Sequence, residues 1–151
     1  MKRFLSLFLA LVMALALAAP AFAAEPDDGD EGIMPLLQVF PDQTVAGRGS
    51  YNSVKFTTTP SNGNYIQVWY ANLASSPARV YLHRIISGRD EIVSVNSSGD
   101  IYLTVNGMSN GSFVYHDATA GSGTYYVTIE CPGNGLINGR LAVGQYVTDP
   151  S

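Results

Sequence analysis

Short runs of alternating apolar and polar residues cover most of the chain beyond its N-terminal region. In one such run Ile66 and Val68 flank Gln67. A period of two places one set of side chains on the core face of a sheet and the other set on its outer face. This pattern predicts strands over residues 36–40, 53–58, 65–70, 80–83, 92–95, 101–105, 112–116, 124–130 and 140–146.

Turn residues separate these runs at intervals of about ten residues, which favours antiparallel sheets over a βαβ arrangement. Asn and Gly tolerate the positive φ angles of tight hairpins. We therefore expect an all-β fold, an antiparallel two-sheet sandwich of about eight or nine strands, jelly-roll-like or immunoglobulin-like. The predicted turns are Ser-Gly at 87–88 and 98–99, and Asn-Gly at 62–63, 106–107, 110–111, 134–135 and 138–139.

The N-terminal region has the order of a secretory signal. Lys2 and Arg3 precede an apolar run over residues 4–19, and small residues follow it. Cleavage between Ala23 and Ala24 fits this order best, whereas a retained membrane anchor would need about 20 apolar residues. We expect a signal peptide over 1–23, an acidic flexible linker over 24–35, a sandwich domain over 36–148 and a tail over 149–151. The product is then secreted and has no stable membrane anchor after cleavage.

Charge is sparse and unevenly distributed. Charged residues make up 13% of the chain, and five of the 12 acids lie in residues 25–32. The remaining chain beyond the linker has seven acids and six bases and is almost neutral. An acidic protein without a basic run is a poor candidate for nucleic-acid binding, so we expect no nucleic-acid partner.

The single cysteine, Cys131, continues the alternation of Tyr125, Val127 and Ile129. We therefore expect a thiol that is buried in the core. A covalent dimer through Cys131 is the alternative in an oxidising compartment. One cysteine also excludes the inter-sheet disulfide of an immunoglobulin domain.

Residues 120–129 read Ala-Gly-Ser-Gly-Thr-Tyr-Tyr-Val-Thr-Ile. This segment resembles a strand of secreted bacterial jelly-roll domains of the pre-peptidase C-terminal type, in which a similar strand follows a Gly-rich turn. The resemblance covers about a dozen residues. It implies an accessory domain without catalysis of its own, and the family's calcium-binding acids have no matching positions here.

Residues suited to catalysis are few and scattered. His83 and His116 form no paired metal motif, and a zinc site with Cys131 would have to be assembled by the fold. No Gly-x-Ser-x-Gly elbow is present. Carboxylates that could pair for glycoside hydrolysis occur beside turns or at outward strand positions. We expect no enzyme, cofactor or metal; the carboxylates in question are Asp90, Glu91, Asp100, Asp117 and Glu130.

Aromatic residues give the strongest functional signal. If Ile66, Val68 and Leu82 face the core, then Tyr65, Trp69 and Tyr81 face outward. Such rings can stack on sugars, with hydrogen bonds from Gln67 and His83. Alternatively, Trp69 is a buried anchor of the sandwich, and the tyrosines only cover a sheet.

These observations predict a secreted, non-catalytic binding module whose partner is a polysaccharide, another cell-surface polymer or an extracellular protein. The alternative is an extracellular structural or interaction protein that assembles through its sheet edges. The first function requires an exposed aromatic strip, and the second requires an uncovered strand edge or apolar patch.

Overall fold

The structure, a computed structural model, describes residues 37–118 and 123–151. All of them belong to the second of two units into which the chain divides, Ile33–Ser151. The predicted signal peptide and acidic linker lie outside the described residues. The elements are β1 (Leu37–Arg48), β2 (Ser50–Asn52), β3 (Phe56–Thr58), η1 (Pro60–Asn62), β4 (Tyr65–Asn72), β5 (Ala78–Ile86), β6 (Arg89–Ile92), β7 (Leu103–Val105), β8 (Ser109–His116), β9 (Gly123–Glu130), η2 (Pro132–Asn134) and β10 (Leu136–Tyr146).

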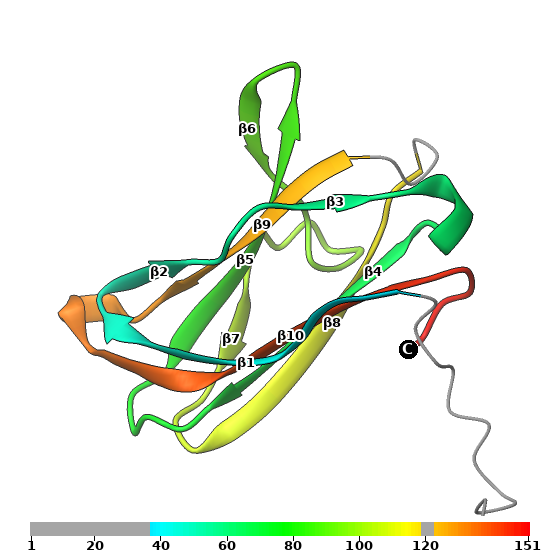
Figure 1. Cartoon of the computed structure of the whole chain (residues 1–151). Helices are drawn as coiled ribbons and strands as arrows, with labels where there is room; N and C mark the ends of the chain where they lie inside the picture. Colours follow the sequence, from blue (N-terminus) through cyan, green and yellow to red (C-terminus); the bar gives the residue numbers. More distant parts are fainter. Residues whose placement is uncertain (1–36, 119–122) are drawn as a thin grey trace, which may run out of the picture. The chain divides into compact units, whose positions relative to one another are not determined.

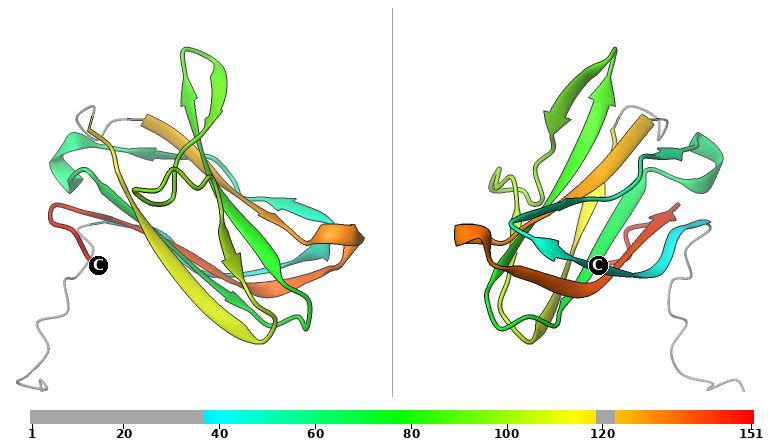
Figure 2. Two further views of the ribbon diagram at one scale, coloured as in Figure 1. Left: turned by 180° about the vertical axis from the view of Figure 1, so that it is seen from behind. Right: turned by 60° about the vertical axis from the view of Figure 1, so that its left-hand side comes forward.

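The strands form two antiparallel sheets, which confirms the predicted all-β sandwich (Figure 1). Sheet A has the order β1-β10-β4-β8. Sheet B has the order β2-β9-β5-β6, with β3 also paired to β9 and β7 also paired to β5. The β5–β6 hairpin projects beyond the other strands in both views of Figure 2.

The described residues contain ten strands rather than eight or nine, partly because the short β2 had no alternating pattern to reveal it. The strand predicted over 92–95 is also misplaced, since β6 ends at Ile92. Val93 and Val95 are nevertheless buried, at 9% and 7% exposure. Their alternation therefore records burial against the core and not membership of a strand.

Two of the predicted Asn-Gly turns are wrong, because residues 110–111 and 138–139 lie inside β8 and β10. Gly139 is needed there for close packing: a Cβ atom would lie 2.3 Å from the Ala71 carbonyl oxygen and 2.6 Å from the Tyr70 hydroxyl. By contrast, the turn at 87–88 is confirmed. Ser87 and Gly88 have φ angles of 50° and 80°, as a tight hairpin between β5 and β6 requires.

The core lies between the sheets and consists of the inward residues of both. Leu82 on β5 and Val68 on β4 belong to one continuous buried cluster. Cys131 is also in this cluster at 3% exposure, which confirms the predicted burial, and the thiol is free. Other members are Val45, Phe56, Ile66, Tyr70, Ala78, Val80, Val93, Val95, Val105, Phe113, Tyr125, Val127, Ile129, Ile137, Leu141 and Val143.

The connection between β4 and β5 carries the chain from sheet A to sheet B. Buried Asn72 holds it: the side-chain amide donates to the Ser76 carbonyl at 2.8 Å, and its oxygen accepts from the Ala74 backbone N–H at 3.1 Å. The same amide also reaches the Val105 carbonyl at 3.2 Å, at the end of β7. One polar side chain thus fixes the change of sheet between two consecutive strands.

A buried ion pair joins the sheets near the end of β8. Arg84 on β5 has the same inward parity as Leu82, and its Nη2 lies 3.3 Å from Oδ2 of the fully buried Asp117. The Tyr125 hydroxyl donates to the same carboxylate at 2.6 Å. Burial, together with this hydrogen bond and the Asp117 charge, raises the pKa of Tyr125 far above its usual range. The carboxylate is therefore held by groups from sheet B.

Candidate functional site

The five predicted site residues divide between opposite sides of the sandwich. Tyr65, Gln67 and Trp69 lie on β4 in sheet A, whereas Tyr81 and His83 lie on β5 in sheet B. The prediction that Tyr65, Trp69 and Tyr81 share one face is therefore wrong. Alternation correctly turned each side chain away from the core, but consecutive strands here belong to different sheets.

On the outer face of sheet B, the aromatic rings pack against one another. His83 stacks on Tyr126 with ring centroids 4.3 Å apart, and Tyr81 packs on Tyr102 at 5.4 Å. The Arg79 guanidinium covers Tyr102 at 4.9 Å. Tyr81 is only 9% exposed, so the expectation of an accessible ring at this position is wrong. Its neighbours on the same face bury it.

The polar groups of this sheet B cluster also have partners. The Asp90 carboxylate accepts a hydrogen bond from the Tyr126 hydroxyl at 2.5 Å and lies 3.1 Å from His83 Nδ1. The Tyr126 hydroxyl, and to a lesser degree His83, lowers the pKa of Asp90. Burial and the Asp90 contact raise the pKa of Tyr126 to about 12. These rings and polar groups already contact one another, so few of them remain available to stack on or hydrogen-bond a flat ligand.

The outer face of sheet A is arranged differently. We call it the Trp69 face. Its centre is β4, and the strand pairing places β8 on one side and β10 on the other. Its residues are Tyr65, Gln67, Trp69, Ser112, Val114, His116, Ala142, Gly144 and Tyr146.

Trp69 has only small cross-strand neighbours, Ser112 on β8 and Ala142 on β10. Its side chain is half-buried and is not part of the core cluster, so Trp69 is not the buried anchor of the sandwich. Among residues 42–118 and 123–151, no aromatic ring or cation packs on the indole. The indole is therefore the aromatic group of this face that is left available to a ligand.

Polar groups lie beside the indole along the same strand. The Gln67 side-chain oxygen accepts a hydrogen bond from the Tyr146 hydroxyl at 2.9 Å. This bond fixes the amide, and its NH₂ group donates no hydrogen bond to any other described residue. One step further, Tyr65 stacks on His116 with centroids 4.6 Å apart. The face thus combines a ring, an amide donor and an imidazole.

Charge on the Trp69 face is low. The exposed carboxylate of Asp42 pairs with Arg140 at its border. His116 adds a weak electrostatic effect at the other end, where it helps hydrogen bonds from Ser151 to lower the pKa of Asp149. Neither end presents a group of like charges, which suits an uncharged ligand better than a phosphate or a nucleic acid.

The sequence analysis missed Tyr146 as a member of this face. Leu141 and Val143 mark the inward positions of β10, so the same parity makes Gln145 inward and Tyr146 outward. Because Gln145 is polar, its residue type did not indicate that position 145 faces the core and that position 146 therefore faces outward. It is fully buried because its amide donates to the Thr59 and Gly63 carbonyls at 2.8 and 2.5 Å.

The described part of the chain contains neither a metal-binding cluster nor a membrane-spanning helix. No group of three or more His, Cys, Asp or Glu side chains there is placed to hold a metal ion. No helix among these residues is long and apolar enough to cross a bilayer.

In comparisons with known proteins, no family model matches the chain, and none of the curated proteins matches it.

Proposed function

We propose that this protein is a secreted, non-catalytic binding module that holds an uncharged polysaccharide against the Trp69 face. The observation that carries the proposal is the half-buried indole of Trp69 between Ser112 and Ala142, with no ring or cation on it among residues 42–118 and 123–151. A pyranose ring presents C–H groups to such an indole and hydroxyl groups to its polar neighbours.

Gln67 supports this choice of ligand. Its amide is held by Tyr146, so a hydrogen bond to a sugar hydroxyl would need little further ordering of the side chain. His116 and Ser112 add polar groups on the neighbouring strand. The secretory signal predicted for residues 1–23 would place the module where glycans and cell-wall polymers occur.

Binding can be measured through the protein's own fluorescence, because the chain contains a single tryptophan. We would titrate xylan, mixed-linkage glucan and solubilised chitin oligomers and test insoluble cellulose and peptidoglycan by co-sedimentation. We expect at least one neutral polymer to bind and to shift the Trp69 emission. Trp69→Ala should then weaken binding about tenfold or more, which corresponds to about 1.4 kcal/mol.

Tyr126→Ala is the matched control, since Tyr126 is an aromatic residue of β9 that stacks on His83 on the outer face of sheet B. It should leave the affinity unchanged. The proposal is overturned if none of these polymers binds. Equal binding by the Trp69→Ala variant and the wild type would also overturn it.

Assembly through a sheet edge is the second candidate function. All four residues of β6 are exposed at the edge of sheet B, and Ile92 is 43% exposed. However, Arg89, Asp90 and Glu91 make up the rest of this strand. Charged residues of this kind protect natural edges from pairing with other chains, so polysaccharide binding is the better supported function. Analytical ultracentrifugation would reveal assembly as a concentration-dependent rise in mass.

A further inference from the structure

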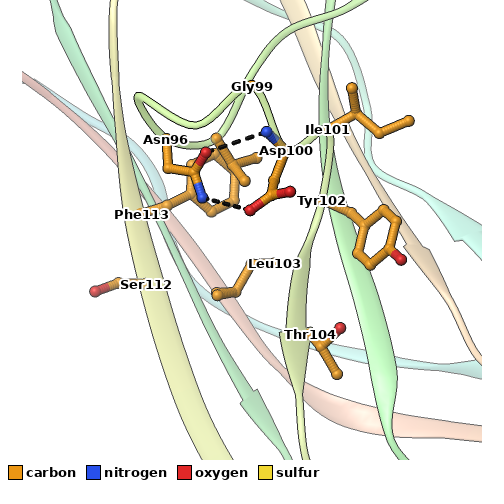
Figure 3. Close-up of a pocket in the computed structure, with 10 residues that line it drawn as sticks. Asn96, Gly99, Asp100, Ile101, Tyr102, Leu103, Thr104, Ser112 and Phe113 are labelled. Carbon is orange, nitrogen blue, oxygen red and sulfur yellow. Dashed lines mark hydrogen bonds between the residues drawn. The ribbon is translucent and has the colours of Figure 1, made fainter.

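A cleft of about 660 Å³ lies where the edges of the two sheets approach each other. One wall comes from β7, which pairs only with β5 of sheet B, and the other comes from β8 of sheet A. The loop that contains Asn96 and Asp100 forms the end of the cleft (Figure 3). This volume is in the range of about 300–1,000 Å³ that is usual for small-ligand sites.

The lining combines apolar surfaces with neutral hydrogen-bonding groups. Leu103 and Phe113 contribute the apolar part, and the Asn96 side chain contributes a neutral amide. Figure 3 shows the Asp100 carboxylate directed into the space above Leu103. It is fixed there by a hydrogen bond of 2.7 Å from the Asn96 amide. A sugar, which has both C–H surfaces and hydroxyl groups, matches this lining.

The charge of the lining narrows the ligand class further. Among the described residues that line it, Asp100 is the one charged residue, and none is Lys, Arg or His. A phosphate-containing polymer or a uronic acid chain would be repelled by the carboxylate. A neutral sugar could instead donate a hydroxyl hydrogen bond to it, and hydrogen bonds to a charged acceptor are the stronger kind.

The cleft is continuous with the Trp69 face through one residue. Ser112 lines the cleft and is also the cross-strand partner of Trp69. Neighbouring strands lie about 4.8 Å apart, so a ligand leaving the indole needs to cross only one strand, β8, to enter the cleft. A single oligosaccharide of a few units can therefore contact both places.

We propose that this cleft is a second subsite for the polymer bound at Trp69, so that the protein recognises a neutral oligosaccharide long enough to cross β8. This proposal rests on the proposed function. It adds a class of ligand, an extended uncharged chain rather than a single sugar, and a residue for its recognition, Asp100.

The test uses cello-, xylo- and chito-oligosaccharides of two to six units and the full chain. We expect wild-type affinity to rise at least tenfold from the dimer to the hexamer of the series that binds. Asp100→Asn keeps the shape of the side chain and should lower affinity for the hexamer three- to tenfold while leaving the dimer unchanged. Glu91→Gln is the control, because it removes the same charge from the exposed β6.

A second readout does not depend on any variant. Addition of the hexamer, but not of the dimer, should shift the backbone amide NMR signals of Leu103 and Thr104. The proposal is overturned if wild-type affinity is the same for all lengths, or if Asp100→Asn binds the hexamer as tightly as the wild type. If the dimer binds in a Trp69-dependent way but the hexamer binds no more tightly than the dimer, only the subsite proposal is overturned. If no oligosaccharide shows Trp69-dependent binding, both proposals are overturned.

Discussion

Replacing Asp117 by Asn tests the ion pair that joins the two sheets. The Asp117 carboxylate is fully buried, accepts the Tyr125 hydroxyl hydrogen at 2.6 Å and lies 3.3 Å from Arg84 Nη2. Asn has nearly the same shape and can still accept the hydrogen bond from Tyr125. It cannot neutralise the guanidinium, so the change isolates the contribution of the charge.

The expected magnitude follows from the burial of the pair. Removing one partner of a buried ion pair costs about 3–5 kcal/mol, because the other charge remains in a poorly solvated place. Glu91 lies opposite Arg84 in the β5–β6 pairing and supplies a second negative charge. We therefore expect the lower end of that range, about 3 kcal/mol, and a fall in Tm of about 12 °C for a domain of this size.

Urea unfolding followed by Trp69 fluorescence measures this loss. The double variant Arg84→Met, Asp117→Asn removes both charges and should recover most of the stability. Asp42→Asn is the control, since the exposed Asp42–Arg140 pair should contribute less than about 1 kcal/mol. A cost below about 1 kcal/mol for Asp117→Asn, or a double variant less stable than the single one, would refute the electrostatic explanation.

Three further predictions concern the tyrosines and the thiol. The buried Tyr70 hydroxyl has no hydrogen-bond partner among the described residues, so Tyr70→Phe should raise the free energy of unfolding by about 1 kcal/mol in urea titrations; a clear loss would contradict this. Cys131 should react slowly with a thiol reagent in the native protein and rapidly in denaturant, whereas rapid native labelling would show that it is accessible. Burial raises the pKa of Tyr70 to about 12, and burial with Asp90 does the same for Tyr126. In the unfolded chain these tyrosines ionise near pH 10, whereas in the folded protein they stay protonated until about pH 12. Raising the pH through this range therefore favours the unfolded state, and Tm should fall between about pH 10 and 12; a constant Tm would contradict the raised pKa values.

Much of the fold could be predicted because alternation acts locally. The inward positions of β4 and β5 follow directly from Val68 and Leu82, and the burial of Cys131 follows from Val127 and Ile129 on the preceding strand. The Ser87-Gly88 turn could also be predicted, because its φ angles favour such residues. In each case the direction of the side chain or the conformation of the turn depends on only a few residues that are adjacent in the sequence.

Polar core positions could not be predicted in this way. Gln145 and Asp117 are buried only because groups distant in the sequence satisfy them, the Thr59 and Gly63 carbonyls for one and Arg84 for the other. A hydropathy pattern has no means of representing such partners. The same holds for Gly139, whose role depends on the approach of Tyr70 from a neighbouring strand.

The candidate site shows the same division between local and tertiary information. The sequence by itself determined that Tyr65, Trp69 and Tyr81 turn away from the core, because side chains alternate along a strand. Only the tertiary structure decided which sheet each strand joins, and the crossing held by Asn72 placed Tyr81 on the opposite side from Trp69. Sheet membership depends on hydrogen bonds between strands far apart in sequence, so alternation within one strand cannot determine it.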